Sequence, residues 1–477
     1  MSAGSEEPVL IGQRELAAER PGTGRGITAR ESGAILVASA VTAVSALGAT
    51  VIAQYALPAG QVSEFLVFWS LLFGLYGVIA GIQQEATRAV GAARLSCAPG
   101  GEPMHRGGEG ADGARPGARV VPVAVGIGAL LAVLVALSSP AWADDQVPSG
   151  STRAVLLVCL GVCLYAVHAA MSGAAAGRQR WYQFAGLGGG EAAWRLLAML
   201  GVGAAAGTLG GLEAAVVSPV LLWAVLVLLS REGRRTFAAR ADVPPGRLTR
   251  NTFLAMGSSA ASAVLMVGFP VVLKATEGEH PDQYRSMVLG VLILGISITR
   301  SPIMIPLQAF QGVAISAFLR QRHRPLAAML RPAAALLGIG LLGGGLAWVI
   351  GPVLFRLIYR PQPEQVRVYD DVVHGWLLGP LTFASAIMAL LVLTGTAVLA
   401  LGAHRTYVLG WAVAAVVAVG LLLLPLGLIP RAMIALYLAP ACGVAVHLVG
   451  MVRAARRYRI QESSQTAVPG GQLAARS

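Results

Sequence analysis

Residues 287–310 read MVLGVLILGISITRSPIMIPLQAF. A membrane-spanning helix needs about 20 mostly apolar residues, and this stretch is long and apolar enough to be one. Its only charged residue is Arg300, which follows thirteen uncharged residues and precedes Pro302 and Pro306. A charge deep in the bilayer costs about 2.5–3.5 kcal/mol on insertion scales and normally faces protein or water. The stretch therefore predicts a membrane helix whose single cation lies against protein or a solvated cavity.

The composition of the whole chain agrees with a membrane protein. Of its 477 residues, 56% are hydrophobic and only 12% are charged, whereas soluble domains carry about 25% charged residues. The basic residues are almost all arginine, and Lys274 is the only lysine. Together with the abundant Ala and Gly, this indicates a GC-rich bacterial genome, so we expect a multi-pass protein of the bacterial plasma membrane.

Twelve apolar segments are long enough to cross the membrane, which predicts an all-α polytopic fold. The predicted spans are 32–54, 64–87, 119–140, 153–175, 185–207, 211–230, 251–273, 286–310, 332–355, 374–400, 407–428 and 432–452. The fifth and sixth have the least distinct boundaries, because Gly and Ala surround the turn near Gly207–Gly211.

The basic residues divide the loops into two sets. One set, which includes both termini, holds 27 arginines, and the alternate loops hold six basic residues. Cytoplasmic loops carry the excess of Lys and Arg, so both termini are predicted to be cytoplasmic. The same distribution explains the net charge of +13 as arginines that hold the topology and face anionic membrane lipids, and not as a nucleic-acid site.

The loops also divide the chain into two halves. We expect a disordered cytoplasmic tail at 1–31, an N-terminal six-helix bundle at 32–230, a cytoplasmic linker at 231–250, a C-terminal six-helix bundle at 251–455 and a cytoplasmic tail at 456–477. The Gly- and Pro-rich loop CAPGGEPMHRGGEGADGARPG, after the second span, is also expected to be disordered.

A weak internal repeat supports the two halves. ITARESGAILVASAV at 27–41 matches LTRNTFLAMGSSAAS at 248–262, and YGVIAGIQQEATRAV matches SPIMIPLQAFQGVAI, at offsets of about 221 and 225 residues. Parallel halves of this kind are related by an axis along the membrane normal, as in transporters that work by alternating access. Chance similarity between apolar segments is the competing interpretation.

A few polar side chains fall inside the spans. In the second span, Gln84, Glu85 and Arg88 share one side, and Glu85 and Arg88 are spaced to form an ion pair. Each of these residues, like Arg300, has two interpretations. Arg300 lines a substrate cavity, or it snorkels or binds carbonyls freed by Pro302 and Pro306. The second-span residues belong to the same cavity, or they form a salt bridge at the cytoplasmic end of the span.

Two further sets of polar residues are candidates for the cavity. Glu191 and Arg195 lie four residues apart in the fifth span, as a self-neutralised pair or as part of a site. Gln308 and Gln311 continue the polar face of the eighth span. Cys159, Cys163 and His168 are better explained by packing than by a metal site. We therefore expect no metal, no cofactor and no catalytic constellation, and the chain is not predicted to be an enzyme.

The second span EFLVFWSLLFGLYGVIAGIQQEATRAV, the opening of the seventh span after a basic loop, and TRSPIMIPLQAF in the eighth resemble polysaccharide flippases of the multidrug/oligosaccharidyl-lipid/polysaccharide exporter superfamily. The resemblance implies two six-helix bundles in a V shape with pseudo-two-fold symmetry. It also implies a central cavity lined by the first, second, seventh and eighth spans, where cations receive the diphosphate of a polyprenyl-linked sugar. Arg300, and Arg88 with Glu85, fit that role. The first span lacks the cationic cluster common in lipid II flippases, which puts lipid II itself in doubt as the substrate.

Three functions remain open from the sequence. The first is a flippase for a lipid-linked oligosaccharide or a related cell-envelope precursor, with that glycan and polysaccharide-biosynthesis enzymes as partners. The second is a cation-coupled drug or metabolite antiporter of the same superfamily, which should carry an acid deep in one bundle. The only deep acids recognised in the spans are Glu85 and Glu191, each beside an arginine. The third is a flippase-like scaffold that transports nothing.

Overall fold

The computed structural model describes residues 28–96, 117–205, 207–276, 282–320, 325–401 and 403–466. Over these residues the chain is helical, with one isolated bridge between Arg119 and Arg240 in place of any sheet. The loop after the second span and most of the N-terminal tail, for which we predicted disorder, lie outside the described part, as do the last residues of the predicted C-terminal cytoplasmic tail. The all-α fold class is confirmed.

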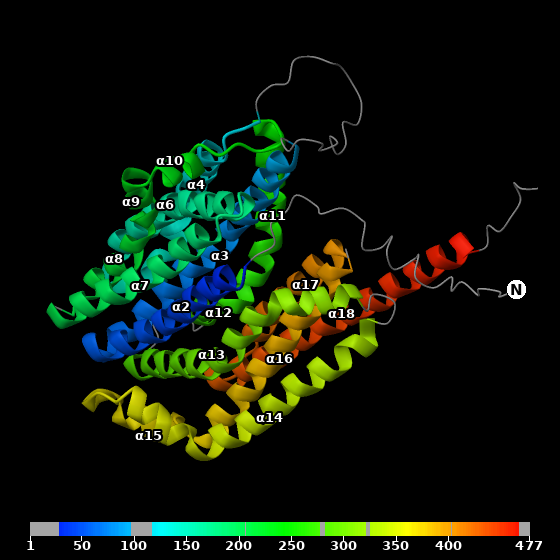
Figure 1. The fold of residues 1–477 in the computed structure, drawn as a ribbon. Coiled ribbons are helices and arrows are strands. Elements are labelled where there is room, and N and C mark those ends of the chain that lie inside the picture. Colours follow the sequence, from blue (N-terminus) through cyan, green and yellow to red (C-terminus); the bar gives the residue numbers. More distant parts are fainter. Residues whose placement is uncertain are drawn as a thin grey trace, which may run out of the picture.

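The N-terminal half forms one group of packed helices, which fills the upper part of Figure 1. Its helices are α2 (Ala29–Ala56), α3 (Ala59–Ser96), α4 (Val120–Ser138), α5 (Ala143–Gln146), α6 (Ser151–Gly177), α7 (Trp181–Ala205), α8 (Leu209–Val217) and α9 (Leu222–Leu229). Pro219 lies between α8 and α9 in a 3-10 turn, so the predicted sixth span is one broken helix. A short helix, α10 (Arg231–Phe237), follows in the predicted linker.

The C-terminal half supplies the second group, which apart from its first helix lies in the lower part of Figure 1. Its helices are α11 (Pro245–Met266), α12 (Phe269–Ala275), α13 (Gln283–Arg320), α14 (Pro325–Ile358), α15 (Val366–Val372), α16 (Gly375–Ala400), α17 (His404–Leu422) and α18 (Leu428–Thr466). Each of the twelve predicted spans falls on one helix or on two consecutive helices. The helices of the eighth and twelfth spans, α13 and α18, extend well beyond the predicted boundaries.

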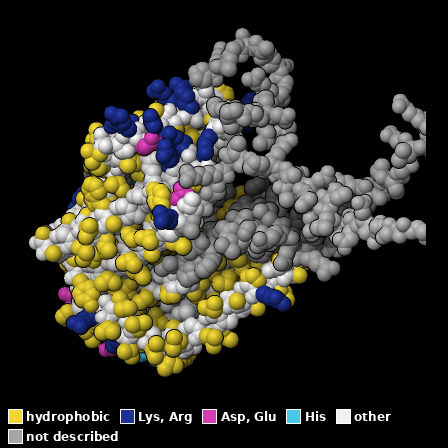
Figure 2. All heavy atoms as spheres, in the orientation of Figure 1, with side chains coloured by type: hydrophobic (Ala, Val, Ile, Leu, Met, Phe, Trp, Pro, Cys, Tyr) yellow, Lys and Arg dark blue, Asp and Glu magenta, His cyan; other side chains and the backbone are white. Residues whose placement is uncertain are grey.

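Within the described residues, ten helices are long and apolar enough to cross a membrane, or eleven if the bent pair α11 and α12 counts as one span. Helix α7, the predicted fifth span, is not among them, because its glycines and its Glu191–Arg195 pair lower its hydropathy. It packs along α2 and α6 inside the N-terminal group. Large apolar side chains of α4, α9 and α14 stay exposed, among them Leu137, Leu229 and Leu342, and Figure 2 shows hydrophobic side chains over much of the surface. This is the surface of a multi-pass membrane protein, which lipid covers.

Helix α11 does not stay with the C-terminal group. It lies along α3, and an added Cβ at Gly81 of α3 would be 2.3 Å from the backbone nitrogen of Met256. Gly77 lies similarly close to Ala263, with an added Cβ 2.8 Å from its side chain. Small residues at such spacing let membrane helices approach closely without a hydrophobic driving force. Helix α11 also packs against α17 of the C-terminal half, so the seventh span lies against both groups, and it bends by 67° where α11 meets α12.

The two groups share a continuous apolar core at the end of the molecule that carries α15. Buried residues of α3 and α6 belong to the same cluster as Leu289 and Leu292 of α13, Phe355 of α14 and Tyr369 of α15. Two smaller clusters lie entirely in the C-terminal half. The bundles are thus packed together at one end, which leaves the region between α2, α3, α11 and α13 as the place where a cavity forms.

Candidate functional site

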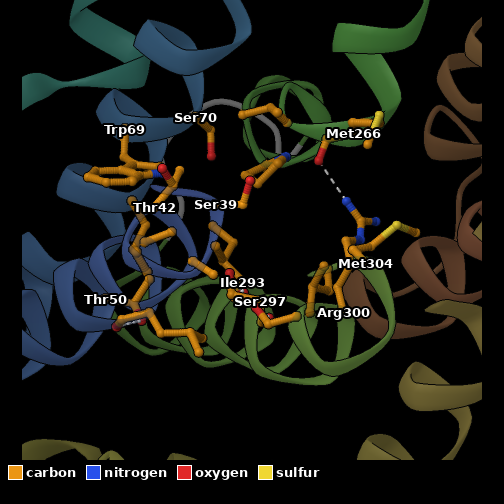
Figure 3. Close-up of a pocket in the computed structure, with 18 residues that line it drawn as sticks. Ser39, Thr42, Thr50, Trp69, Ser70, Met266, Ile293, Ser297, Arg300 and Met304 are labelled. Carbon is orange, nitrogen blue, oxygen red and sulfur yellow. Dashed lines mark hydrogen bonds between the residues drawn. The ribbon is translucent and has the colours of Figure 1, made fainter. Parts of the chain in front are cut away.

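A cavity of about 400 Å³ lies between the two bundles. Its walls come from α2, α3, the break between α11 and α12, and α13, which are the first, second, seventh and eighth spans. Figure 3 shows the side chains around this space. The polar residues that line it are Ser39, Thr42, Thr50, Ser70, Ser297, Arg300 and Ser301.

Arg300 is the only charged residue on the described cavity wall. Its Nη1 donates a hydrogen bond to the carbonyl oxygen of Met266 at 2.8 Å, and the carbonyl of Leu265 is 3.5 Å away. In a continuous helix the Met266 carbonyl would accept from the backbone N–H four residues later, but that residue is Pro270, which has none. Arg300 therefore supplies the donor that Pro270 lacks and holds the bend between α11 and α12.

Arg300 also keeps binding capacity for a ligand. Guanidinium carries five N–H donors, and in the described structure Arg300 donates through Nη1 alone. No acidic side chain among the described residues pairs with it. The alternative interpretation, in which Arg300 binds carbonyls freed by Pro302 and Pro306, differs from the structure, because its acceptors, the carbonyls of Leu265 and Met266, belong to α11.

The cavity hydroxyls have a common hydrogen-bond pattern. Ser39, Thr42, Ser297 and Ser301 each donate to the backbone carbonyl four residues earlier, at 2.8–2.9 Å. A hydroxyl that has given its only proton to its own helix presents acceptor lone pairs to its surroundings. The wall thus combines several neutral acceptors with one cationic donor group.

Trp69 connects the cavity to a buried polar cluster in the N-terminal bundle. One side of Trp69 faces the cavity, and the guanidinium carbon of Arg195 lies 5.8 Å from its ring centroid. Arg195 is only 3% exposed and is paired with Glu191. Nε2 of His168 lies 3.8 Å from the other oxygen of Glu191, and Nδ1 of His168 has no partner among the described groups. Glu191 and Arg195 are therefore behind the cavity wall and not on it.

The second-span candidates lie elsewhere. Arg88 pairs with Glu85 at 2.6 Å and with Asp242 at 3.2 Å, and Asn251 donates to the same Glu85 carboxylate at 3.2 Å. These contacts join α3 to α11 and to the segment that leads into it. Gln84 is exposed, and none of the three predicted residues lines the cavity. The side chains of Gln308 and Gln311 lie outside the part of the chain that the structure describes.

At the predicted outer end, hydrogen bonds join α2 to the segment between α14 and α16; we call these contacts the outer latch. The amide of Gln54 donates to Gln365 Oε1 at 2.7 Å and to the Arg360 carbonyl at 3.2 Å. The amide of Gln362 donates to the carbonyls of Gln54 and Leu57 at 3.1 and 2.7 Å. Thr50 contacts the hydroxyl of Tyr359 at 2.8 Å. Burial raises the pKa of Tyr359, so this hydroxyl stays protonated.

Sequence reasoning missed several of these residues. The cavity hydroxyls were detectable, because Ser39 with Thr42 and Ser297 with Ser301 recur at helical spacing. Glu213 was overlooked as a deep acid because it lies near the edge of its span. It is fully buried and pairs with Arg153 at 3.0 Å. No local sequence pattern indicated Asp242, since its partner Arg88 is 154 residues away.

The described residues contain no group of three or more His, Cys, Asp or Glu side chains that could hold a metal ion. Cys159 and Cys163 donate to the carbonyls of Ala132 and Gly128 on α4, at 3.3 and 3.7 Å. These thiols serve as packing groups between α4 and α6.

The chain has two similar proteins in Mycobacterium tuberculosis strain H37Rv, both described as uncharacterized. It is 34% identical to Rv1510 over 435 residues, which covers 90% of this chain and 93% of the relative. It is 32% identical to Rv3630 over 421 residues, or 87% and 90% of the two chains. No family model matches the sequence.

The fold is similar to that of solved transporters. A MOP superfamily transporter from Pyrococcus furiosus has a TM-score of 0.57 at 15% identity and covers 91% of this chain and 95% of its own. An inward-facing multidrug resistance MATE family transporter of the same superfamily has a TM-score of 0.56 at 16% identity, over 91% of this chain and 100% of its own. The MATE multidrug transporter DinF-BH has a TM-score of 0.57 at 14% identity, over 90% and 94%. These likenesses establish the two-bundle fold of the superfamily.

Proposed function

We propose that this chain, which belongs to the same protein family as Rv1510 and Rv3630 of Mycobacterium tuberculosis, is a membrane transporter that flips a polyprenyl-diphosphate-linked oligosaccharide or a related cell-envelope precursor. The observation that carries this proposal is the charge of the cavity wall. Arg300 is its one ion, and no carboxylate among the described lining residues offsets it. A diphosphate in a low-dielectric cavity needs such a permanent cation, and guanidinium binds phosphate oxygens in a bidentate manner.

The neutral part of the cavity wall is suited to bind a sugar next to the phosphate. Ser39, Thr42, Ser297 and Ser301 present acceptor lone pairs, which match the hydroxyl donors of a glycan. Trp69 offers an aromatic face in the same space. The opposite charge pattern, an acid in the cavity, would suit a cationic drug. For the solved Pyrococcus furiosus transporter, a reversed polarity of the binding pocket has itself been read as a sign of a different function.

We infer that transport proceeds by alternating access, with the two bundles, 32–230 and 251–455, moving against each other and both termini in the cytoplasm. The outer latch joins the bundles on the predicted outer side. The bend that Arg300 holds lies between α11 and α12, and α11 contacts both bundles. A diphosphate that takes donors from Arg300 competes with the Met266 carbonyl, so ligand binding and the angle of the seventh span are coupled.

The decisive experiment separates a substrate-binding Arg300 from one that only caps α11. Arg300→Ala is expected to abolish flipping of a lipid-linked oligosaccharide in vesicles, and Arg300→Lys to retain part of it. Pro270→Ala returns a backbone N–H to the position that the Met266 carbonyl needs. If Arg300 binds substrate, the double variant Arg300→Ala/Pro270→Ala stays inactive.

Recovery of flipping in this double variant would show that Arg300 is a helix cap and would remove the proposed anion site. Membrane amounts of each variant are compared by immunoblot. Arg405→Ala removes an exposed arginine at the start of α17 and serves as the matched control, which should flip normally.

A second candidate function is cation-coupled exchange of a drug or metabolite. It is favoured by one observation, the buried cluster of Glu191, Arg195 and His168 behind Trp69. Proton binding would change the charge of this cluster, and the Trp69 ring, which lies against both Arg195 and the cavity, would transmit the effect. Under this function, Glu191→Gln removes the dependence of transport on a proton gradient, whereas a flippase that does not use this cluster keeps its gradient response.

A further inference from the structure

Four arginines converge on a pocket at the end of the N-terminal bundle, away from the transport cavity. The pocket has a volume of about 540 Å³ and is lined by Arg94 of α3, Arg178 and Arg180 of the α6–α7 turn, and Arg240 beyond α10, with Val90, Ala93 and Ala239. No acid lines it among the described residues. Figure 2 shows dark blue side chains gathered at the end of the molecule where α10 lies. We call this the arginine pocket.

The turn between α6 and α7 places two of these arginines. Gln179 has a φ of 57°, a left-handed conformation that few non-glycine residues adopt. The N–H of Arg180 donates to the Ala175 carbonyl at 2.8 Å and fixes this turn. The reversal brings Arg178 and Arg180 to one pocket wall, and Nη1 of Arg94 donates to the Arg178 carbonyl at 3.4 Å.

The positive charge of the arginine pocket is only partly compensated. Glu232 of α10 pairs with Arg180 at 3.0 Å, with Arg178 at 3.8 Å and with Arg235 at 2.8 Å, so one carboxylate serves three arginines. Burial lowers the pKa of Arg178, and the charges of Arg180 and Arg235 lower it further, while Glu232 opposes them. A bound anion would relieve this repulsion and use the remaining N–H donors.

An apolar surface continues directly from the arginine pocket. A neighbouring pocket of about 680 Å³ shares Arg94, Arg178 and Arg180, contains Glu31 and Glu232, and extends along α7 and α9 over Leu187, Leu222, Val225 and Leu229. Leu229 is 82% exposed at the last turn of α9, just before Ser230 and Arg231. Trp181 and Tyr182 begin α7 at the same level, as aromatic residues do at the membrane–water boundary. A ligand that fits has a phosphate at one end and an acyl chain at the other.

We propose that the arginine pocket binds the phosphate headgroup of an anionic phospholipid, whose acyl chains lie along α7 and α9. The site is separate from the transport cavity and does not depend on which substrate the cavity carries. A soluble phosphate compound offers the same anion but cannot contact the apolar surface. A lipid is therefore the occupant that fits both the arginine pocket and the apolar surface beside it.

The test uses the purified full-length chain in nonionic detergent and measures binding by native mass spectrometry. The probes are dioctanoyl-phosphatidylglycerol, dioctanoyl-phosphatidylcholine and glycerol 3-phosphate. The variant Arg180→Gln/Arg240→Gln removes two pocket charges, whose side chains contact Glu232 and the Gly117 carbonyl respectively. Arg247→Gln/Arg250→Gln removes two charges from the start of α11, outside both pockets, and is the matched control. Size-exclusion profiles show that each variant is folded.

We expect the wild type to bind the phosphatidylglycerol at least about tenfold more tightly than the phosphatidylcholine. At about 1 kcal/mol for each basic residue near an anionic headgroup, the pocket variant should lose about tenfold to thirtyfold of this affinity. The control should change by less than about threefold, as expected for weaker surface electrostatics. If both double variants lost the same affinity for phosphatidylglycerol, the binding would be explained by general surface charge, and the proposal would be overturned. Glycerol 3-phosphate binding as tightly as the lipid would also overturn it, in favour of a soluble anion site.

Discussion

Opening of the proposed transporter to the outside must break the outer latch, and this can be tested by removing it. The variant Gln54→Leu/Gln362→Leu keeps apolar bulk but deletes the hydrogen bonds that these two amides donate, to Gln365 Oε1, to the Arg360 carbonyl and to the carbonyls of Gln54 and Leu57. Gln54 is 1% exposed, so water does not compete for the bonds of its amide until the latch opens.

The expected effect follows from the number of bonds. Each is worth about 0.5–1.5 kcal/mol net, so four bonds favour the closed outer end by about 2 kcal/mol at the least. A loss of about 2 kcal/mol raises the population that is open to the outside by roughly thirtyfold, since each 1.4 kcal/mol is a factor of about ten. The amides contribute only while the bundles are together, and the open state therefore gains relative to the closed one.

The assay measures access to the cavity from outside the cell. The four native cysteines are replaced, and Ala46, an exposed residue of the cavity wall, is changed to Cys. A membrane-impermeant maleimide added to intact cells should label this cysteine roughly thirtyfold faster in the latch variant, in proportion to the open population. Ser149→Ala is the control, because it breaks a 2.7 Å hydrogen bond to Glu64 within one bundle. Unchanged labelling in the latch variant, with normal amounts of protein in the membrane, would refute the reasoning.

Three further predictions concern the rest of the fold. Replacing Glu191 or Arg195 alone with Leu should cost about 3–5 kcal/mol, because a buried charge is left unpaired, whereas the double Leu variant should recover most of the folded yield in detergent; a double variant as poor as the singles would contradict this. Gly81→Leu should abolish folding or transport, because its side chain meets the α11 backbone, while Gly60→Leu on the same helix, with open space around it, should be tolerated; equal damage from both would remove the role of the close contact. A reporter fused at Gly246 should be cytoplasmic, and an external signal there would reverse the orientation.

Ten of the twelve predicted spans, or eleven with the bent pair α11 and α12, are candidate membrane helices among the described residues, and they could be predicted because burial in lipid is a property of each segment by itself. A helix must satisfy its backbone internally in the bilayer, so a run of about 20 apolar residues is enough to identify it. The same reasoning offered a cavity as one of two places for Arg300 before any contact was known, since a lone charge in such a run needs water or protein around it. Glu191 and Arg195 were recognised as a pair from their spacing along one helix.

Contacts between distant helices were beyond this reasoning. Arg88 lies beside Asp242, and Arg300 beside the Met266 carbonyl, only because α11 crosses to α3 and then bends at Pro270. Lipid tails are as apolar as leucine side chains, so hydropathy carries no information on which membrane helices pair. Close packing at small residues such as Gly77 and Gly81 makes that choice. The number of helices and their charged residues are thus local properties of the chain, while the cavity wall, the outer latch and the arginine pocket exist only where packing brings separate segments together.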